Sequence, residues 1–207
     1  MNAQTDWRQI PGPAGVLEVA IDQPAAEPLG TAVVAHPHPL FGGTLNNKVV
    51  QTLAKAFVQC GWTAVRFNFR GVGDSAGAYD EGRGERDDLL CVVNTLAPEG
   101  RLCLAGFSFG AFVTSHAVQE LHSARALDHL VLVGTAASRF AVAPVPQELH
   151  LRTLIVHGET DDTVPLSSVL DWARPQSLPV LVVPAGGHFF HGQLPLLRDL
   201  VARHLRA

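Results

Sequence analysis

Short apolar runs alternate with longer amphipathic stretches along the chain, and this alternation predicts strands separated by helices. The predicted strands are runs of aliphatic, β-branched or aromatic residues at 16–21, 31–35, 63–69, 102–107, 130–133, 151–156 and 180–183. Residues 7–10 are predicted to pair with the first of these across the turn at 11–15. The predicted helices have apolar residues at helical spacing and cover 45–60, 85–96, 109–121, 167–173 and 194–205.

Strands that alternate with helices predict an α/β fold with a mostly parallel twisted sheet and helices on both faces. Functional sites of such sheets lie at the edge where the strands end. The 207 residues contain no internal repeat or low-complexity linker, so we expect a single domain spanning 1–207. Only about fifteen residues, 134–150, separate two predicted strands where a lid would be inserted. We therefore expect no cap domain and no activation at a lipid–water interface.

Composition excludes several classes of protein. Apolar residues make up 47% of the chain and charged residues 16%, which is typical of a globular protein. The net charge is −4 without a basic run, so we expect neither nucleic-acid binding nor membrane association. Three widely spaced cysteines and the absence of a signal-peptide pattern over residues 1–8 indicate reduced thiols and a cytoplasmic location. No apolar run approaches the ~18 residues that a membrane span needs.

The segment Gly106-Phe107-Ser108-Phe109-Gly110 has the form G-x-S-x-G and lies between a predicted strand and a predicted helix. This context is that of a nucleophile elbow, in which a tight turn exposes a serine hydroxyl. The turn requires small neighbours so that strand and helix can pass closely, and the two glycines meet that requirement. The pattern predicts that Ser108 is a nucleophile.

A serine hydroxyl needs a base that removes its proton, and the base needs an acid that holds it in one tautomer. Asp161 follows the predicted strand 151–156, and His188 follows the strand 180–183, which is the expected chain order. Each has a rival nearby. Asp162 adjoins the predicted acid and His191 lies three residues beyond the predicted base. We favour Asp161 for its spacing and His188 because two glycines precede it and it follows its strand sooner.

An oxyanion that forms during acyl transfer needs two backbone N–H donors. Phe109, directly after the nucleophile, is predicted to supply one. The other is expected from the loop after strand 31–35, where Pro37 and Pro39 have no N–H. Leu40 and His38 remain, and we favour Leu40.

Three other features in the sequence have structural interpretations. His36-x-His38 lacks a third strong ligand, so we predict no metal site and a hydrogen bond of His36 within its loop. Arg70 precedes a glycine-rich turn without the ending of a phosphate loop, and it is predicted to pair with Glu85 or Asp88. Cys103 is predicted to be an inert core residue. Four aromatic residues could line an acyl pocket: Phe41, Phe107, Phe189 and Phe190.

These motifs resemble those of the α/β-hydrolase superfamily over nearly the whole chain. More narrowly, HPHPLFGGTLNNKVV and AVRFNFRGVGDSAG resemble small lidless bacterial serine hydrolases related to dienelactone hydrolases and acyl-peptidase catalytic domains. The resemblance places the nucleophile on Ser108, the acid on Asp161 and the base on His188. Dienelactone hydrolases use cysteine as nucleophile, so their substrate does not transfer. Many relatives have His-Gly where this chain has His36-Pro37.

The sequence therefore predicts a cofactor-independent serine hydrolase of a small ester or related acyl bond, acting through an acyl-enzyme. Thioesterase activity and small-peptide or amide hydrolysis need the same three side chains and stay open as alternatives. A catalytically idle binding protein with this fold is the alternative from another class. The acyl chain length, the leaving group and the oligomeric state stay open as well.

Overall fold

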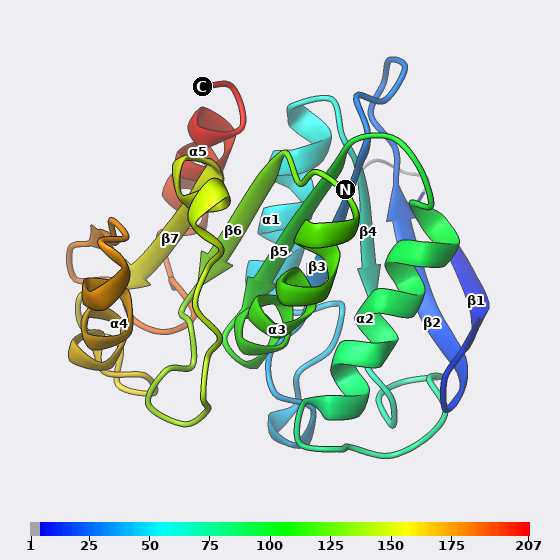
Figure 1. Cartoon of the computed structure of the whole chain (residues 1–207), viewed down its shortest axis with the longest axis horizontal. Coiled ribbons are helices and arrows are strands. Elements are labelled where there is room, and N and C mark those ends of the chain that lie inside the picture. Colours follow the sequence, from blue (N-terminus) through cyan, green and yellow to red (C-terminus); the bar gives the residue numbers. More distant parts are fainter. Residues whose placement is uncertain (1–4) are drawn as a thin grey trace.

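The structure, a computed structural model, describes residues 5–207, which form one eight-stranded sheet with helices on both faces (Figure 1). Residues 1–4, part of the segment inspected for a signal peptide, lie outside the described residues. The strands are β1 (Asp6–Gly12), β2 (Gly15–Asp22), β3 (Thr31–Ala35), β4 (Thr63–Phe67), β5 (Leu102–Phe107), β6 (His129–Val133), β7 (Thr153–Gly158) and β8 (Leu181–Val183).

The strands follow the order β1-β2-β4-β3-β5-β6-β7-β8 across the sheet. β1 and β2 form the predicted antiparallel hairpin, and β2 lies antiparallel to β4. All remaining neighbours are parallel. Parallel strands joined by crossovers end at the same edge, so the loops after β3, β5, β6, β7 and β8 gather there. The prediction of a mostly parallel sheet is confirmed.

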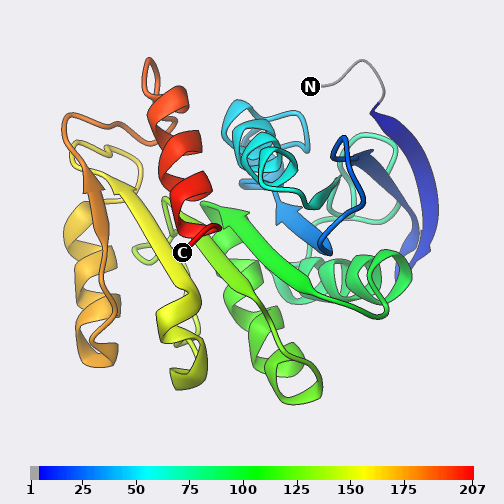
Figure 2. The same cartoon turned by 90° about the horizontal axis from the view of Figure 1, so that it is seen from above.

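The helices form a layer on each face of the sheet (Figure 2). One layer holds α1 (Lys48–Gln59) and α5 (Leu194–His204), which pack against each other. The other holds α2 (Arg83–Leu96), α3 (Phe109–Ala124) and α4 (Leu166–Ala173). This arrangement buries both faces of the central strands.

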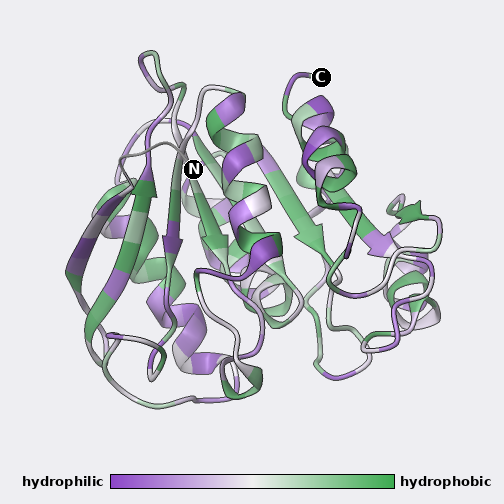
Figure 3. Cartoon of the chain, turned by 180° about the vertical axis from the view of Figure 1, so that it is seen from behind, coloured by the Kyte–Doolittle hydropathy of each residue, from purple (hydrophilic) through white to green (hydrophobic). Residues whose placement is uncertain are grey.

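The sheet separates two apolar clusters. On β3, Val33 packs in the cluster beneath α2, α3 and α4, whereas Ala32 and Val34 pack beneath α1 and α5. Strands buried on both faces are apolar at successive positions, which explains their continuous hydrophobic colour in Figure 3. Cys103 on β5 is fully buried in the α1/α5 cluster, and burial raises the pKa of its thiol. It therefore has the properties of the predicted inert core cysteine.

Several element boundaries differ from the predicted ones, and for α1 and β7 the local cause is clear. α1 begins at Lys48 and not at residue 45, because the side-chain oxygen of Asn47 accepts the N–H groups of Val49 and Val50 and caps the helix there. β7 begins at Thr153, because Gln147–Arg152 form a 3₁₀ helix. Leu151, predicted as the first strand residue, lies in that helix with its side chain 98% exposed.

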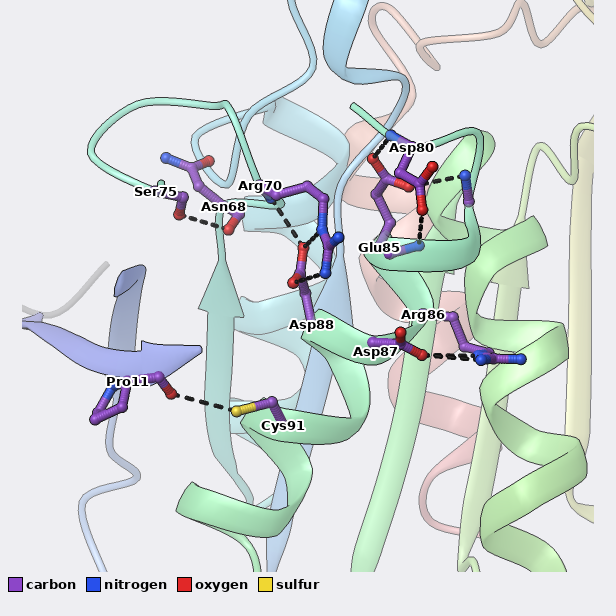
Figure 4. A network of polar contacts seen from close by, with 12 residues as sticks. Pro11, Asn68, Arg70, Ser75, Asp80, Glu85, Arg86, Asp87, Asp88 and Cys91 are labelled. Atoms are coloured by element: carbon purple, nitrogen blue, oxygen red, sulfur yellow. Dashed lines mark hydrogen bonds and ion pairs between the residues drawn. The ribbon is translucent and has the colours of Figure 1, made fainter. Parts of the chain in front are cut away.

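Arg70 pairs with Asp88, one of its two predicted partners (Figure 4). Its Nε and Nη2 donate to the two carboxylate oxygens at 3.0 and 2.8 Å, and its main-chain N–H donates to the same carboxylate. Glu85 has another role, since it accepts the N–H groups of Asp80 and Gly82 at the start of α2. The pair thus ties the loop after β4 to α2, as the structural interpretation of Arg70 predicts.

The connection between β6 and β7 is short. It carries the 3₁₀ helix Gln147–Arg152 and, within residues 5–207, no inserted cap domain. In the same part of the chain, every helix is too short or too polar to cross a bilayer.

One buried histidine, His36, and one half-buried histidine, His129, predict that acidification destabilises the fold. Burial lowers the pKa of His36 to about 4, and burial together with the neighbouring His204 lowers that of His129 to about 4. Both titrate near 6.5 in an unfolded chain, so between about pH 6.5 and 4 the unfolded state binds more protons. Each histidine then contributes a slope of up to about 1.4 kcal/mol per pH unit. We expect the free energy of unfolding to fall as the pH is lowered from 7 to 4.5.

Urea denaturation across that range measures the slope, and His129→Gln should make it shallower because one titrating group is gone. A free energy of unfolding that is constant from pH 7 to 4.5 would contradict this expectation.

Candidate active site

Ser108 lies at the tip of a sharp turn between β5 and α3. Its backbone has φ 57° and ψ −115°, a conformation that costs a non-glycine residue free energy. Its N–H donates to the Val133 carbonyl at 2.9 Å, and its own carbonyl accepts the N–H groups of Ala111 and Phe112. These bonds hold the strained residue between β6 and α3, with Ser108 8% exposed in the wall of a cavity.

The glycines beside Ser108 are required by close backbone contacts. A Cβ on Gly106 would lie 2.6 Å from the nitrogen of Ala111 in α3. A Cβ on Gly110 would meet the main-chain carbonyls of Ala35 and His36 at the end of β3. The sequence-based expectation that both positions must be small therefore has a specific cause. Strand, helix and the neighbouring strand end pass too closely for any side chain.

The structure brings the three predicted side chains together from three loops. His188, which follows β8, places Nε2 3.0 Å from Ser108 Oγ and Nδ1 2.7 Å from a carboxylate oxygen of Asp161. All three residues are at least 92% buried. An Nδ1–H that donates to the carboxylate leaves Nε2 as the acceptor for the serine proton. The arrangement can therefore deprotonate the Ser108 hydroxyl.

Asp161 is held as a charged acceptor by its loop. One carboxylate oxygen accepts the N–H groups of Thr163 and Val164 at 2.9 and 2.8 Å, and the other accepts from His188. Burial alone would raise the pKa of this carboxyl, but the bonds from His188 and Val164 outweigh it and hold the pKa below its ordinary value. Asp162, the rival, is exposed and bonds only to the Thr163 hydroxyl.

The rival histidine does not reach Ser108. His191 is exposed, and its ring lies 6.0 Å from that of Phe189. The ring of His188 instead packs on Phe107 with 4.9 Å between ring centroids, which fixes it above the end of β5.

His157 was missed by the sequence analysis. It is fully buried at the end of β7, and its Nε2 lies 2.9 Å from the Val164 carbonyl and 3.5 Å from the Asp161 carboxylate. Burial lowers its pKa, so the ring is neutral and Nε2–H donates to Val164. His157 thereby closes the loop that carries Asp161. The His157-Gly158 pair immediately before the acid loop is the sequence signal that could have identified it.

The two predicted oxyanion donors differ in their surroundings. Phe109 lines the cavity with Ser108, and its N–H has no acceptor among residues 5–207. Leu40 is 67% exposed, does not line the cavity, and donates its N–H to Nδ1 of His38 at 3.2 Å. This occupied N–H argues against Leu40. His38, the alternative, lines the cavity, and the described part of the chain offers its N–H no acceptor.

His36 makes the predicted loop hydrogen bond and one further contact. Nδ1–H donates to the Pro37 carbonyl at 2.6 Å, and Nε2 accepts the N–H of Phe69 at 3.0 Å. Both ring nitrogens are therefore engaged in joining the loop after β3 to the end of β4. Within residues 5–207, no group of three or more potential metal ligands is present.

A cavity of about 350 Å³ opens in front of Ser108 and His188. Two of the four aromatic residues predicted for an acyl pocket, Phe41 and Phe189, line it. Phe107 and Phe190 do not; both are fully buried in the cluster beneath α1 and α5. The loops after β3, β5 and β6 contribute further lining residues. Phe109 and His38 are the oxyanion-donor candidates named from the sequence, whereas Asn47, Arg139 and Phe140 were not predicted.

Comparisons with known proteins agree with this geometry. A serine hydrolase without a lid from Xanthomonas campestris is 36% identical, with a TM-score of 0.89 over 100% of this chain and 95% of that chain. A serine hydrolase homologue from Coxiella burnetii is 40% identical, with a TM-score of 0.82 over 99% and 100%. An uncharacterised Rickettsia prowazekii protein is 33% identical over 173 residues, 77% of this chain and 68% of its own length. No family model matches the chain.

Gly110→Ala should destabilise the fold, because its Cβ would collide with the rigid main chain at the end of β3. We expect a loss of about 1–3 kcal/mol in the free energy of unfolding, measured by urea denaturation. Gly187→Ala is the matched control, since nothing lies within 4 Å of its Cβ position. That variant should stay within about 1 kcal/mol of the wild type. Equal effects of the two substitutions would refute the close-approach argument.

Proposed function

The chain belongs to the lidless α/β serine hydrolases, and from that premise we propose that it cleaves a carboxylic ester or related acyl bond of a small substrate. The observation that carries the proposal is the continuous hydrogen-bonded series from Ser108 through His188 to Asp161, with links of 3.0 and 2.7 Å. A binding protein without catalysis has no need of a buried series in this order.

In the proposed reaction, His188 accepts the Ser108 proton at Nε2 while the serine oxygen attacks the substrate carbonyl carbon. Asp161 holds the Nδ1–H bond and stabilises the imidazolium that forms. Collapse of the tetrahedral intermediate releases the alcohol, which takes the proton from His188 and leaves an ester between the acyl group and Ser108. Water then attacks that ester with His188 again as base, and Ser108 is regenerated.

The developing oxyanion needs N–H donors that are already in position. We propose the main-chain N–H groups of Phe109 and His38 for this role. Both residues line the cavity with Ser108, and neither N–H has an acceptor in the described part of the chain. The loop that carries His38 is anchored by His36 to β4, so the donor is fixed before substrate arrives.

The cavity indicates the kind of substrate. Its volume of about 350 Å³ falls at the lower end of small-molecule sites. Aromatic side chains form much of its wall, which favours an apolar or planar group next to the scissile carbonyl: Phe41, Phe109, Phe140 and Phe189. Thioesters and amides of the same acyl group would fit the same space. Hydrolysis rates of an ester, a thioester and an amide that share one acyl group would show which bond type is preferred.

Labelling with a fluorophosphonate tests the proposed nucleophile without knowledge of the substrate. We expect one adduct, on Ser108, located by peptide mass spectrometry, and no adduct on Ser108→Ala. The variant should also lose hydrolysis of 4-nitrophenyl acetate by a factor on the order of 10⁶. Ser167→Ala, on the exposed surface of α4, is the matched control and should label like the wild type. Folded wild-type protein that takes no label would overturn the proposal.

Asp161→Asn should lower the turnover number far more than Asp162→Asn. An amide at position 161 cannot stabilise the imidazolium and favours the wrong tautomer of His188, which costs on the order of 10⁴-fold in a well-studied protease. Asp162 is exposed and has no contact with His188, so its amide should be nearly neutral. Steady-state hydrolysis of the same ester measures both. The reverse order would move the acid by one residue.

A further inference from the structure

Among residues 5–207, one cationic side chain lines the cavity, and that side chain has no hydrogen-bond or ion-pair partner there. Arg139, on the loop after β6, lines the cavity together with Ser108 and His188. Its guanidinium makes no hydrogen bond or ion pair within residues 5–207. Most described arginines are instead paired with a carboxylate. The guanidinium groups of Arg203 and Arg206 also have no partner within residues 5–207. Both residues lie close to the C-terminus, and neither lines the cavity.

No acidic side chain among residues 5–207 lines the cavity to balance this charge. The Asp161 carboxylate lies buried behind His188, with both oxygens engaged in hydrogen bonds. Asp162 borders an adjoining hollow that Arg139 also borders, but within residues 5–207 no ion pair joins the two side chains. The one formal charge in the cavity wall is therefore positive, and the N-terminal end of α3 adds a dipole of the same sign.

A second donor lies in the same wall. His38 Nδ1 accepts the N–H of Leu40, which places the proton of the neutral ring on Nε2. That Nε2–H has no acceptor in the part of the chain that the structure describes. The His38 ring packs against Phe109 and Phe140 with centroid distances of 4.9 and 5.8 Å. Phe140 directly follows Arg139 in the chain, so these contacts fix the ring near the loop that carries Arg139.

From this unpaired guanidinium and ring N–H in the wall of one cavity, we propose that the substrate carries a carboxylate in addition to its scissile acyl bond. The inference rests on the proposed function. A guanidinium donates two parallel hydrogen bonds to a planar carboxylate, and a bond with two charged partners is among the stronger ones in proteins. The carboxylate belongs to either the acyl half or the alcohol half of the ester. Both sources present the same chemistry to Arg139.

Two pairs of esters separate these sources. In the acyl arm, the 4-nitrophenyl monoester of glutaric acid is compared with its neutral methyl ester. In the alcohol arm, 4-acetoxybenzoate is compared with its methyl ester. We expect kcat/KM for the charged member of one pair to exceed that of its neutral partner by about tenfold or more, as for a charge-assisted hydrogen bond.

Arg139→Gln should abolish this preference, so that the charged and neutral members of each pair react at similar kcat/KM. Arg139→Lys should retain part of the preference, because a point charge replaces the planar guanidinium. The loss should appear mainly in KM, because the contact is the same in the ground state and in the transition state. Arg198→Gln is the matched control, an exposed arginine on α5 paired with Asp199, and it should keep the wild-type preference.

The outcomes distinguish this inference from the proposed function. Wild-type protein that labels on Ser108 and hydrolyses charged and neutral esters at equal rates would overturn the carboxylate inference and leave the proposed function standing. A preference that survives Arg139→Gln would also overturn it. Protein that neither labels nor hydrolyses any of the four esters would overturn both.

Discussion

The backbone conformation of Ser108 is the constraint on which the rest of the structure depends. A serine with φ 57° costs on the order of 1–3 kcal/mol, and contacts with the surroundings must offset that cost. The Val133 carbonyl of β6 accepts the Ser108 N–H, and two N–H groups of α3 donate to the Ser108 carbonyl. Gly106 and Gly110 let the three backbones meet without side chains between them. Ser108 therefore occupies a fixed point, and the loops after β7 and β8 have only to bring their side chains to it.

Burial and hydrogen bonding have opposite effects on the pKa of Asp161, and the effect of hydrogen bonding is the larger. The loss of water favours the protonated carboxyl, but bonds from His188, Thr163 and Val164 keep it ionised. His157, neutral because burial lowers its pKa, closes the same loop through the Val164 carbonyl. The negative charge of Asp161 thus lies behind the imidazole, whereas the formal charge that residues 5–207 place in the cavity wall is positive.

The sequence predicts those features that depend on local pattern and chain order. Strands alternate with helices, and a serine, an acid and a histidine follow β5, β7 and β8 in that order. This pattern is sufficient to predict that the side chains of Ser108, Asp161 and His188 come together. Orientation within a loop is not encoded in that way. The N–H of Leu40, the donor favoured from the sequence, already has an acceptor because the side chain two residues earlier turns back onto it. Phe140 and Arg139 could not be placed in the cavity from the sequence, because nothing in the nineteen-residue connection between β6 and β7 specifies which of its side chains face Ser108.

Phe41 has a consequence for how binding energy is used. It stands at the rim of the cavity with 84% of its surface exposed, on a short turn that begins at Pro39. A substrate long enough to lie against it would remove apolar surface from water, worth about 25 cal/mol per Å². That contact is remote from the scissile carbonyl and does not change as the carbonyl becomes tetrahedral. Affinity gained there lowers the substrate concentration at which the site fills. It leaves the barrier to reaction from the bound state unchanged.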